Sequence, residues 1–296
     1  MTKEPSGTAI AFIGLGMMGL PMAKRLVASG YDVTGFDLFE NARSEFAAAG
    51  GKVAASVADA CAGKDFAITM LPNERIVRDA LMGDGGGAFS LPRGAVVIDM
   101  SSSAPSGTIE LAKQLDAMGI ALIDAPVSGG VKKAIDGSLA IMIGGEDATI
   151  DSIRPVLAPL AASLIVAGKV GAGHAIKSLN NFVSAAGLTA MSEALSIGQR
   201  FGIAPDTIIA VLNASSGRNN STENKAKQFI LSGTFQAGFT MALMAKDIGI
   251  AAKLAEELDI DAPALAATCE YWRSANEALG PGADHTEIYR YISKKS

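Results

Sequence analysis

Short apolar runs alternate with helical segments throughout the first half of the chain. Between the runs lie alanine-rich amphipathic pieces such as PMAKRLVASG and IELAKQLDAMG. Strands joined by helical crossovers form a parallel sheet with helices on both faces. The pattern therefore predicts an α/β domain with a doubly wound parallel sheet, whose strands we expect at AIAFIG (9–14), DVTGF (32–36), FAITML (66–71), AVVIDM (95–100), ALIDAPV (121–127) and LAIMIGG (139–145).

The strand pattern ends after SLIVAG (163–168), and the rest of the chain has helical periodicity. Turn residues at Gly202, SSG, SGTFQAGF and GPGAD separate the helical stretches. We therefore predict an α/β domain over residues 1–168 and an all-α domain over residues 169–296 that begins with a long interdomain helix. The helices are expected at about 174–201, 205–214, 221–232, 240–259 and 262–279.

Composition narrows the function classes. Hydrophobic residues make up 49% of the 296 residues and charged residues only 19%, which is typical of a folded globular protein. The net charge of -5 provides no basic surface for nucleic acid. Two cysteines without a CxxC motif and two histidines predict neither a disulfide framework nor a metal site. The sequence shows no signal peptide and no membrane-spanning run, so we expect a cytoplasmic protein.

The stretch FIGLGMMGLPMAKRL has three glycines in the GxGxxG spacing, directly after a predicted strand and at the start of a predicted helix. Gly14 would allow the tight turn, Gly16 the approach of a pyrophosphate, and Gly19 close packing of helix on strand. The helix N-terminus would offer N–H groups to the phosphates. The alternative is a glycine-rich turn without a ligand. We expect a dinucleotide loop formed by Gly14, Leu15, Gly16, Met17, Met18 and Gly19.

The second predicted strand ends at Asp37. An acidic residue there can accept hydrogen bonds from the adenosine ribose hydroxyls and repel a 2′-phosphate, which favours NAD. Because Arg43 follows a few residues later, NADP is not excluded.

Two loops follow the third and fourth strands at the carboxyl edge of the sheet, where open α/β sheets bind ligands. In the first loop, Met70, Leu71 and Pro72 could flank the adenosine and ribose, and in the second Ser102 could reach the nicotinamide. The alternative for the serine run is a helix N-cap, a role that Ser106 could also take.

Two further stretches could bind a substrate. In DAPVSGG, Ser128, Gly129 and Gly130 could turn successive N–H groups toward one carboxylate, although a plain turn has the same composition. In GAGHAIKSLNN, Lys177 and Asn181 are one helical turn apart and share a face. The alternative for Lys177 is a lysine that extends from the helix edge into water.

The stretches GLGMMGLPMA, DAPVSGG, GAGHAIKSLNN and MAKDIG, in this order, resemble the β-hydroxyacid dehydrogenase family over essentially the whole chain. The resemblance implies a Rossmann domain followed by an all-α domain. It implies that Lys177 is the catalytic lysine, that Asn181 orients the substrate and that residues 128–130 bind its carboxylate. It also implies that Lys246 lies near the cofactor and the substrate, and that Asp247 contacts the cofactor or has a structural role.

By this resemblance the protein is an NAD-dependent oxidoreductase that interconverts a short β-hydroxyacid and its semialdehyde, without a metal. 3-Hydroxyisobutyrate is the leading substrate, and tartronate semialdehyde reduction is the alternative. A non-catalytic NAD-binding sensor or scaffold is the alternative from another class. Asn180 and Ser184 stand where the related 6-phosphogluconate dehydrogenases have a histidine and a glutamate acid, which argues against decarboxylation. The amphipathic helices of the predicted all-α domain suggest a homodimer or homotetramer.

Two segments are left open by the sequence. The polar cluster Arg218, Asn219 and Asn220 could contact the distal end of a substrate, or it could be a solvated turn before a helix capped by Ser221 or Thr222. The segment 284–287 keeps only the aspartate of the family's C-terminal pattern, and His285 within it is expected at the surface or at a subunit interface.

Overall fold

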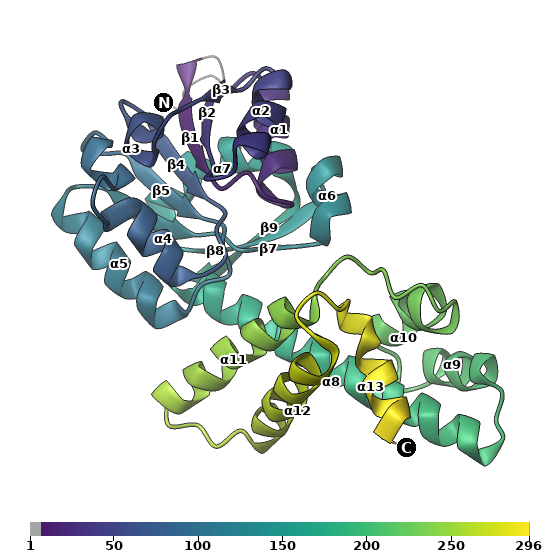
Figure 1. Ribbon diagram of the computed structural model, residues 1–296. Helices are drawn as coiled ribbons and strands as arrows, with labels where there is room; N and C mark the ends of the chain where they lie inside the picture. The colour runs from purple at the N-terminus through teal and green to yellow at the C-terminus, as the bar shows by residue number, and fades with distance from the viewer. Residues whose placement is uncertain (1–6, 296) are drawn as a thin grey trace. The chain divides into compact units, whose positions relative to one another are not determined.

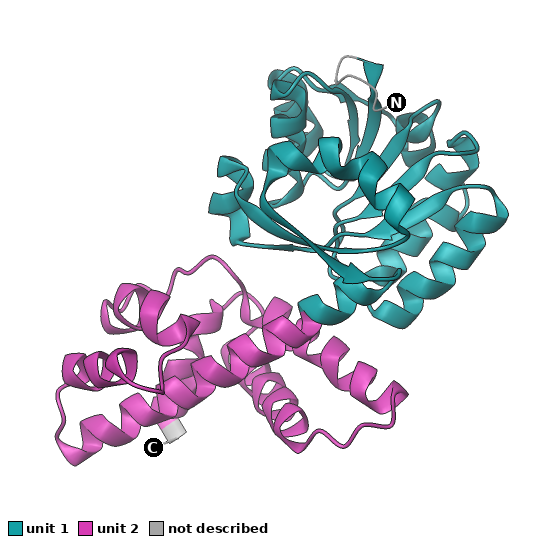
Figure 2. Ribbon diagram, turned by 180° about the vertical axis from the view of Figure 1, so that it is seen from behind, with its two compact units in different colours: residues 1–177 teal, residues 178–296 magenta. Residues whose placement is uncertain are grey.

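The computed structural model describes residues 7–295, which divide into two compact units, Met1–Lys177 and Ser178–Ser296 (Figure 2). Residues 1–6 and 296 lie outside the described part, so the expectation that the chain has no signal peptide concerns residues that are only partly described. The predicted boundary after residue 168 stays a prediction. Among residues 7–295, no helix is both long and apolar enough to cross a membrane.

Unit 1 is built on one twisted sheet with the strand order β3-β2-β1-β4-β5-β6-β8-β7, and β9 pairs with β8 (Figure 1). The pairs from β3 to β6 are parallel. The doubly wound fold predicted from the sequence is therefore confirmed. The strands are β1 Ala9–Ile13, β2 Asp32–Phe36, β3 Lys52–Val53, β4 Phe66–Thr69, β5 Val96–Asp99, β6 Ala121–Asp124, β7 Val127–Ser128, β8 Leu139–Gly144 and β9 Ala161–Gly168.

Alternation along the central strands places a separate apolar core on each face of the sheet. In β1, Ile10 and Phe12 join one core, whereas Ala11 and Ile13 join the other. The first core is covered by α1 Gly19–Ala28, α2 Glu40–Ala48, α6 Gly130–Asp136 and α7 Asp147–Leu157. The second is covered by α3 Val57–Cys61, α4 Glu74–Met82 and α5 Pro105–Ala117 (Figure 1).

One edge of the sheet departs from the prediction of a parallel sheet. β8 is antiparallel to both β6 and β7, and β9 returns parallel to β8. Because β7 pairs directly with β8, the chain reverses direction between β7 and β8 instead of crossing over to a parallel strand. The two-residue strands β3 and β7 were too short to show a periodic pattern in the sequence.

Unit 2 is a helical bundle around a core that includes Trp272, whose indole Nε1 donates a hydrogen bond to Thr189 Oγ1 at 3.0 Å. Its first helix, α8 Ala172–Phe201, begins in unit 1 and continues into unit 2. The others are α9 Pro205–Ala214, α10 Asn220–Asn224, the π-helix Ala226–Leu231, α11 Met241–Glu257, α12 Pro263–Leu279 and α13 Ile288–Lys295.

Two helical predictions need correction. The helix expected over 221–232 is interrupted at Lys225, where α10 gives way to the π-helix. The chain after Gly280 contains a 3₁₀ turn, His285–Glu287, and the helix α13, neither of which the sequence analysis anticipated. Capping boxes at Asn219 and Asp284, rather than apolar periodicity, mark where α10 and the 3₁₀ turn begin.

Candidate active site

Three glycines shape the loop between β1 and α1. Gly14 has a φ of +99°, and a Cβ there would lie 2.3 Å from the Met70 carbonyl oxygen. A Cβ at Gly19 would lie 1.9 Å from the Gly14 carbonyl oxygen. Gly16, in contrast, would place a Cβ in open space. Since α1 also begins without a side-chain cap, backbone N–H groups of its first turn can bind phosphate, and the loop fits a dinucleotide pyrophosphate.

The other residues of this loop differ in what they can offer a ligand. Met17 is 73% exposed and Met18 is half-buried. The Leu15 side chain is buried in the core, and its backbone N–H donates to Asp37 Oδ2 at 2.7 Å. Leu15 therefore holds the loop in place, and its side chain does not face solvent.

Asp37 follows the end of β2 and lies beside the glycine loop. Its Oδ1 accepts a hydrogen bond from the Phe39 backbone N–H at 2.9 Å. Arg43 Nη1 donates to the carbonyl oxygens of Asp37 and Leu38, at 2.5 and 3.1 Å. Because each carboxylate oxygen has a second lone pair, Asp37 can accept ribose hydroxyls while it keeps the loop in place.

The loops after β4 and β5 are joined by a serine that the sequence analysis did not select. Ser101 Oγ accepts the backbone N–H of Leu71 at 2.9 Å, and Met70 N–H donates to Ile13 O at 2.9 Å. Ser102 is half-buried and Pro72 is exposed.

Ser106 is not the cap of the helix that follows. α5 begins at Pro105 with Ala104 as N-cap residue, so the proposed capping role of Ser106 is wrong. The reason is that proline is well suited to the first helical position, which places Ser106 already inside the helix.

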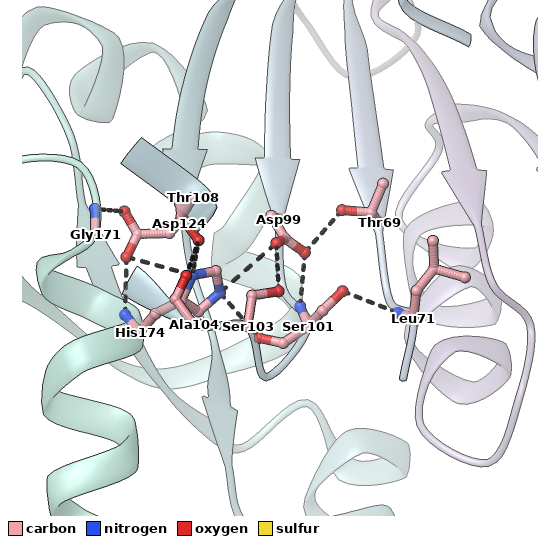
Figure 3. Close-up of polar contacts among 10 residues, drawn as sticks. All are labelled: Thr69, Leu71, Asp99, Ser101, Ser103, Ala104, Thr108, Asp124, Gly171 and His174. Carbon is pink, nitrogen blue, oxygen red and sulfur yellow. Dashed lines mark hydrogen bonds and ion pairs between the residues drawn. The ribbon is translucent and has the colours of Figure 1, made fainter. Parts of the chain in front are cut away.

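A buried polar network centres on His174, at the start of α8 (Figure 3). Its Nε2 lies 3.0 Å from the Ser101 carbonyl oxygen, and its Nδ1 lies 2.8 Å from Thr108 Oγ1. A carbonyl oxygen only accepts, so Nε2 carries a proton. The carboxylates of Asp99 and Asp124 lie 3.8 and 3.9 Å from the two ring nitrogens.

Both carboxylates are also fixed by other donors. Asp124 accepts the backbone N–H groups of Gly171 and His174, at 2.7 and 2.8 Å. Burial raises the pKa of Asp124, and the neighbouring His174 and these N–H groups oppose the rise. Asp99 accepts from Thr69 Oγ1 at 2.8 Å and from the Ser101 N–H at 3.0 Å. The network thus joins β4, β5, β6 and the loop after β5 to the first turn of α8.

No sequence pattern predicted this network. His174 was considered only as a potential metal ligand and as part of the stretch GAGHAIK, and no role was predicted for Asp99 or Asp124. A usable signal was present, since both aspartates end adjacent strands and the histidine precedes Lys177 by three residues. Among residues 7–295, no group of His, Cys, Asp and Glu could hold a metal ion.

The segment predicted to bind a carboxylate forms the junction between β7 and α6. Ser128 is half-buried and ends β7, and Gly129 and Gly130 are exposed. Both glycines have positive φ values, +138° and +69°. Since side chains rarely adopt this conformation, glycine is required at both positions for the turn.

Lys177 and Asn181 follow one another on α8, one turn apart. Lys177 is only 8% exposed, although Ile176 beside it is 44% exposed. The reading of Lys177 as a lysine that extends into water is therefore wrong. Asn181 Nδ2 donates to Asp247 Oδ2 at 2.6 Å, and Lys246 Nζ lies 3.2 Å from Asp247 Oδ1. Unit 2 thus brings together Asn181, Lys246 and Asp247, which are far apart in the sequence.

The polar cluster after α9 forms a helix cap. Asn219 caps α10 through a reciprocal capping box with Thr222, so the cap is neither Ser221 nor Thr222 alone. Arg218 is exposed and lies 3.8 Å from Glu223. This arrangement corresponds to the turn alternative for the cluster.

The segment 284–287 is buried rather than superficial. His285 is 3% exposed and its Nδ1 lies 3.0 Å from the Phe239 carbonyl oxygen, so its expected surface location is wrong. Burial lowers the pKa of His285, and the adjacent Asp284 opposes that effect. Asp284 caps the 3₁₀ turn with Glu287 as its partner in a capping box.

Comparisons with known proteins agree with this geometry. The family model described as the NAD binding domain of 6-phosphogluconate dehydrogenase matches residues 9–168, more than half of the chain. The model described as NAD-binding of NADP-dependent 3-hydroxyisobutyrate dehydrogenase matches residues 171–292.

Among relatives, 2-(hydroxymethyl)glutarate dehydrogenase of Eubacterium barkeri is 38% identical over 275 residues, 93% of this chain and 91% of the relative. The mitochondrial 3-hydroxyisobutyrate dehydrogenase of Rattus norvegicus is 38% identical over 252 residues, 83% of this chain and 75% of the relative.

A solved structure of 3-hydroxyisobutyrate dehydrogenase from Mycobacterium tuberculosis with L-serine matches with a TM-score of 0.91 and 32% identity. The match covers 96% of this chain and 99% of the other. The glycine loop, the α/β unit followed by a helical unit, and these relatives all agree. The chain therefore belongs to the β-hydroxyacid dehydrogenase family, whose members are NAD(P)-dependent oxidoreductases acting on CH–OH groups.

Proposed function

We propose that the protein interconverts a short β-hydroxyacid and its semialdehyde, with Lys177 as the group that takes up and returns the hydroxyl proton. 3-Hydroxyisobutyrate with methylmalonate semialdehyde is the first pair to test, because several of the matched proteins are named for 3-hydroxyisobutyrate. Glycerate with tartronate semialdehyde is the second pair.

The burial of Lys177 is the observation that carries the proposal. A lysine amine loses hydration free energy when it is removed from water. On α8 the residue Lys177 is only 8% exposed, while the apolar Ile176 and Val183 are 44% and 66% exposed. This arrangement is the reverse of an ordinary amphipathic helix, and such unfavourable burial of a titratable group is typical of catalytic sites.

The reaction requires two transfers from the alcohol. A bound nicotinamide would supply the acceptor for the hydride that leaves the C–H bond of the alcohol. In the same direction, the Lys177 amine takes the proton from the hydroxyl oxygen as the C–O bond becomes a carbonyl. In the reverse direction the Lys177 ammonium returns this proton, and its charge stabilises the negative charge that develops on the oxygen.

Other residues would hold the ligands. Ser128 and the N–H groups of Gly129 and Gly130 would bind the substrate carboxylate, and Asn181 would orient the substrate. Its amide is held by Asp247, which in turn is beside Lys246. The loop 14–19 would bind the pyrophosphate. Asp37 supports a preference for NAD over NADP, and Met70, Leu71, Pro72 and Ser102 would line the rest of the dinucleotide site.

We also propose that the protein is a cytoplasmic homodimer or homotetramer. Val183, Ile197 and Phe201 of α8 are 66%, 69% and 84% exposed, and large apolar side chains are costly to leave in water. Static light scattering of the purified protein tests this point, and a monomer across the micromolar range would contradict it.

The test of the reaction is NAD reduction by the purified protein with a panel of short 3-hydroxyacids and matched uncharged alcohols. Lys177→Met should lower kcat by roughly 100- to 10,000-fold, the usual share of acid–base catalysis, with NAD affinity unchanged. Lys169→Met is the matched control, because Lys169 is exposed.

Three outcomes separate the possibilities. Lysine-dependent oxidation of one acid supports the proposal and identifies the substrate. Turnover that survives in Lys177→Met refutes the role of the lysine. NAD binding without turnover of any substrate favours the non-catalytic sensor.

The carboxylate site has its own test. Ser128→Ala should raise KM for a β-hydroxyacid more than KM for the corresponding uncharged alcohol, since only the acid uses the site. If both KM values rise alike, the substrate carboxylate binds elsewhere.

A further inference from the structure

Lys225 occupies an irregular position in unit 2. It ends α10 and precedes the π-helix Ala226–Leu231, with φ and ψ of -119° and -40°. π-Helical segments are rare and are frequent at functional sites. The side chain is half-buried, and its Nζ lies 3.4 Å from Ser184 Oγ of α8.

Ser184 places this ammonium group next to the substrate-orienting asparagine. Asn181 and Ser184 are three residues apart on α8, so their Cβ atoms are neighbours at about 5–6 Å on one helix face. The Lys225 ammonium is therefore bound to the residue that adjoins Asn181, one turn further from Lys177 along the helix.

Lys225 differs from the other cations of this region in its partners. Lys227 lies 3.3 Å from Asp206 and Arg218 lies 3.8 Å from Glu223, and both side chains are more than 60% exposed. Among the residues that the structure describes, the only hydrogen-bond partner of the Lys225 ammonium group is Ser184 Oγ, and the bond is long at 3.4 Å. An ammonium group has three N–H donors, so two remain for a ligand.

The carboxylate of Asp284, whose charge acts on Lys225, is already hydrogen-bonded to other donors. Its oxygens accept the backbone N–H groups of Gly238 and Thr286, both at 2.9 Å, and the Thr286 hydroxyl. His285 Nδ1 lies 3.4 Å away. Asp284 acts on Lys225 only through its field, and burial lowers the pKa of Lys225 to about 8 despite this field.

We propose that Lys225 binds a second carboxylate at the far end of the substrate, so that the preferred substrate is a dicarboxylic β-hydroxyacid or its semialdehyde. The proposal rests on the proposed function for the reacting end of the molecule. A bound carboxylate supplies the acceptor that the ammonium lacks. Monocarboxylic acids such as 3-hydroxyisobutyrate leave Lys225 without a ligand.

The test compares two acids that differ only at the distal group, 2-(hydroxymethyl)glutarate and 2-(hydroxymethyl)pentanoate. Wild-type protein should show the higher kcat/KM for the dicarboxylate. Lys225→Gln should lower kcat/KM for the dicarboxylate roughly 10- to 100-fold, the loss expected for a hydrogen bond between charged groups, and mainly through KM. The pentanoate should change by less than about threefold, since no lost contact affects it.

Two controls accompany this measurement. Lys227→Gln removes an exposed lysine two residues away and should change neither acid. Lys225→Arg keeps the charge and should keep the preference for the dicarboxylate. A binding measurement independent of turnover uses calorimetry of glutarate and pentanoate with the NAD-loaded protein, in which wild type should bind glutarate more tightly and Lys225→Gln should not.

Each possible outcome either supports or refutes the role proposed for Lys225. Equal losses for both acids in Lys225→Gln would mean that the lysine only supports the fold. A wild-type protein that binds glutarate no better than pentanoate would overturn the proposal whatever the variants do. If neither acid is oxidised, the proposed reaction fails, and the calorimetric preference still decides whether Lys225 binds the distal carboxylate.

Discussion

Replacing His174 with alanine should destabilise unit 1 strongly. The imidazole side chain is fully buried, and it makes hydrogen bonds to the Ser101 carbonyl oxygen and to Thr108 Oγ1. In the alanine variant the Thr108 hydroxyl can donate to the Ala104 carbonyl oxygen, but the buried Ser101 carbonyl oxygen loses its donor. An unsatisfied buried acceptor costs about 1–3 kcal/mol, and the lost second bond costs about 1 kcal/mol.

The cavity left by the ring adds to this cost, which brings the expected loss to about 3–5 kcal/mol, a large share of an ordinary domain's stability. His174→Gln should lose less, since a glutamine amide can still donate to the Ser101 oxygen. A double-mutant cycle with Thr108→Val should give a coupling energy of about 1 kcal/mol, because the two residues are in direct contact.

Urea unfolding followed by two probes measures the loss. Far-UV circular dichroism follows both units, whereas the fluorescence of Trp272, the single tryptophan, follows unit 2. The circular dichroism midpoint should fall at least as far as the fluorescence midpoint. A loss below about 1 kcal/mol in His174→Ala, or zero coupling with Thr108, would refute the reasoning, because the buried bonds would then contribute nothing net.

Three other predictions concern the cofactor loop and the buried carboxylate. Gly19→Ala should lower both the melting temperature and the NAD affinity, because its Cβ would lie 1.9 Å from a carbonyl oxygen. Gly16→Ala should weaken NAD binding and leave the melting temperature unchanged. An equal fall in melting temperature for the two variants would contradict this. Asp37→Asn keeps the acceptor for Leu15 but removes the charge, so the ratio of kcat/KM for NAD to that for NADP should fall, and an unchanged ratio would argue against ribose recognition. Burial raises the folded-state pKa of Asp124 from 3.8, so between pH 3.8 and the raised pKa the folded state binds more protons than the unfolded state. This residue's contribution to stability is therefore present at low pH and is lost as pH rises through the raised pKa. Asp124→Asn should remove that decline, which urea titrations at several pH values would reveal.

Much of the fold was predictable because it depends on periodic patterns. β2 and α9 have the predicted bounds, and the GxGxxG spacing located the turn between β1 and α1. These features need only local chemistry, since alternation selects strands and a 3.6-residue period selects helices. The doubly wound order then follows from the handedness and shortness of the connections.

Part of the site was predictable because one motif has a clear steric explanation. Gly14 and Gly19 stand where a side chain would strike backbone atoms, which is why glycine is needed there. The pairing of His174 with Asp99 and Asp124 was not predictable in this way. The sequence does not show which polar residues are buried, and the role of a buried polar group depends on its hydrogen-bond partners.

The longer strands and helices in their order, the dinucleotide loop and the residue types available for acid–base chemistry could all be derived from the sequence. Only the folded chain reveals that Lys177 is buried beside exposed apolar residues, that His285 lies inside the bundle and that Lys225 contacts Ser184 of another helix. The physical reason is that periodicity and turn preference act over a few residues, whereas burial, electrostatic fields and hydrogen-bond partners are set by residues far apart in the chain.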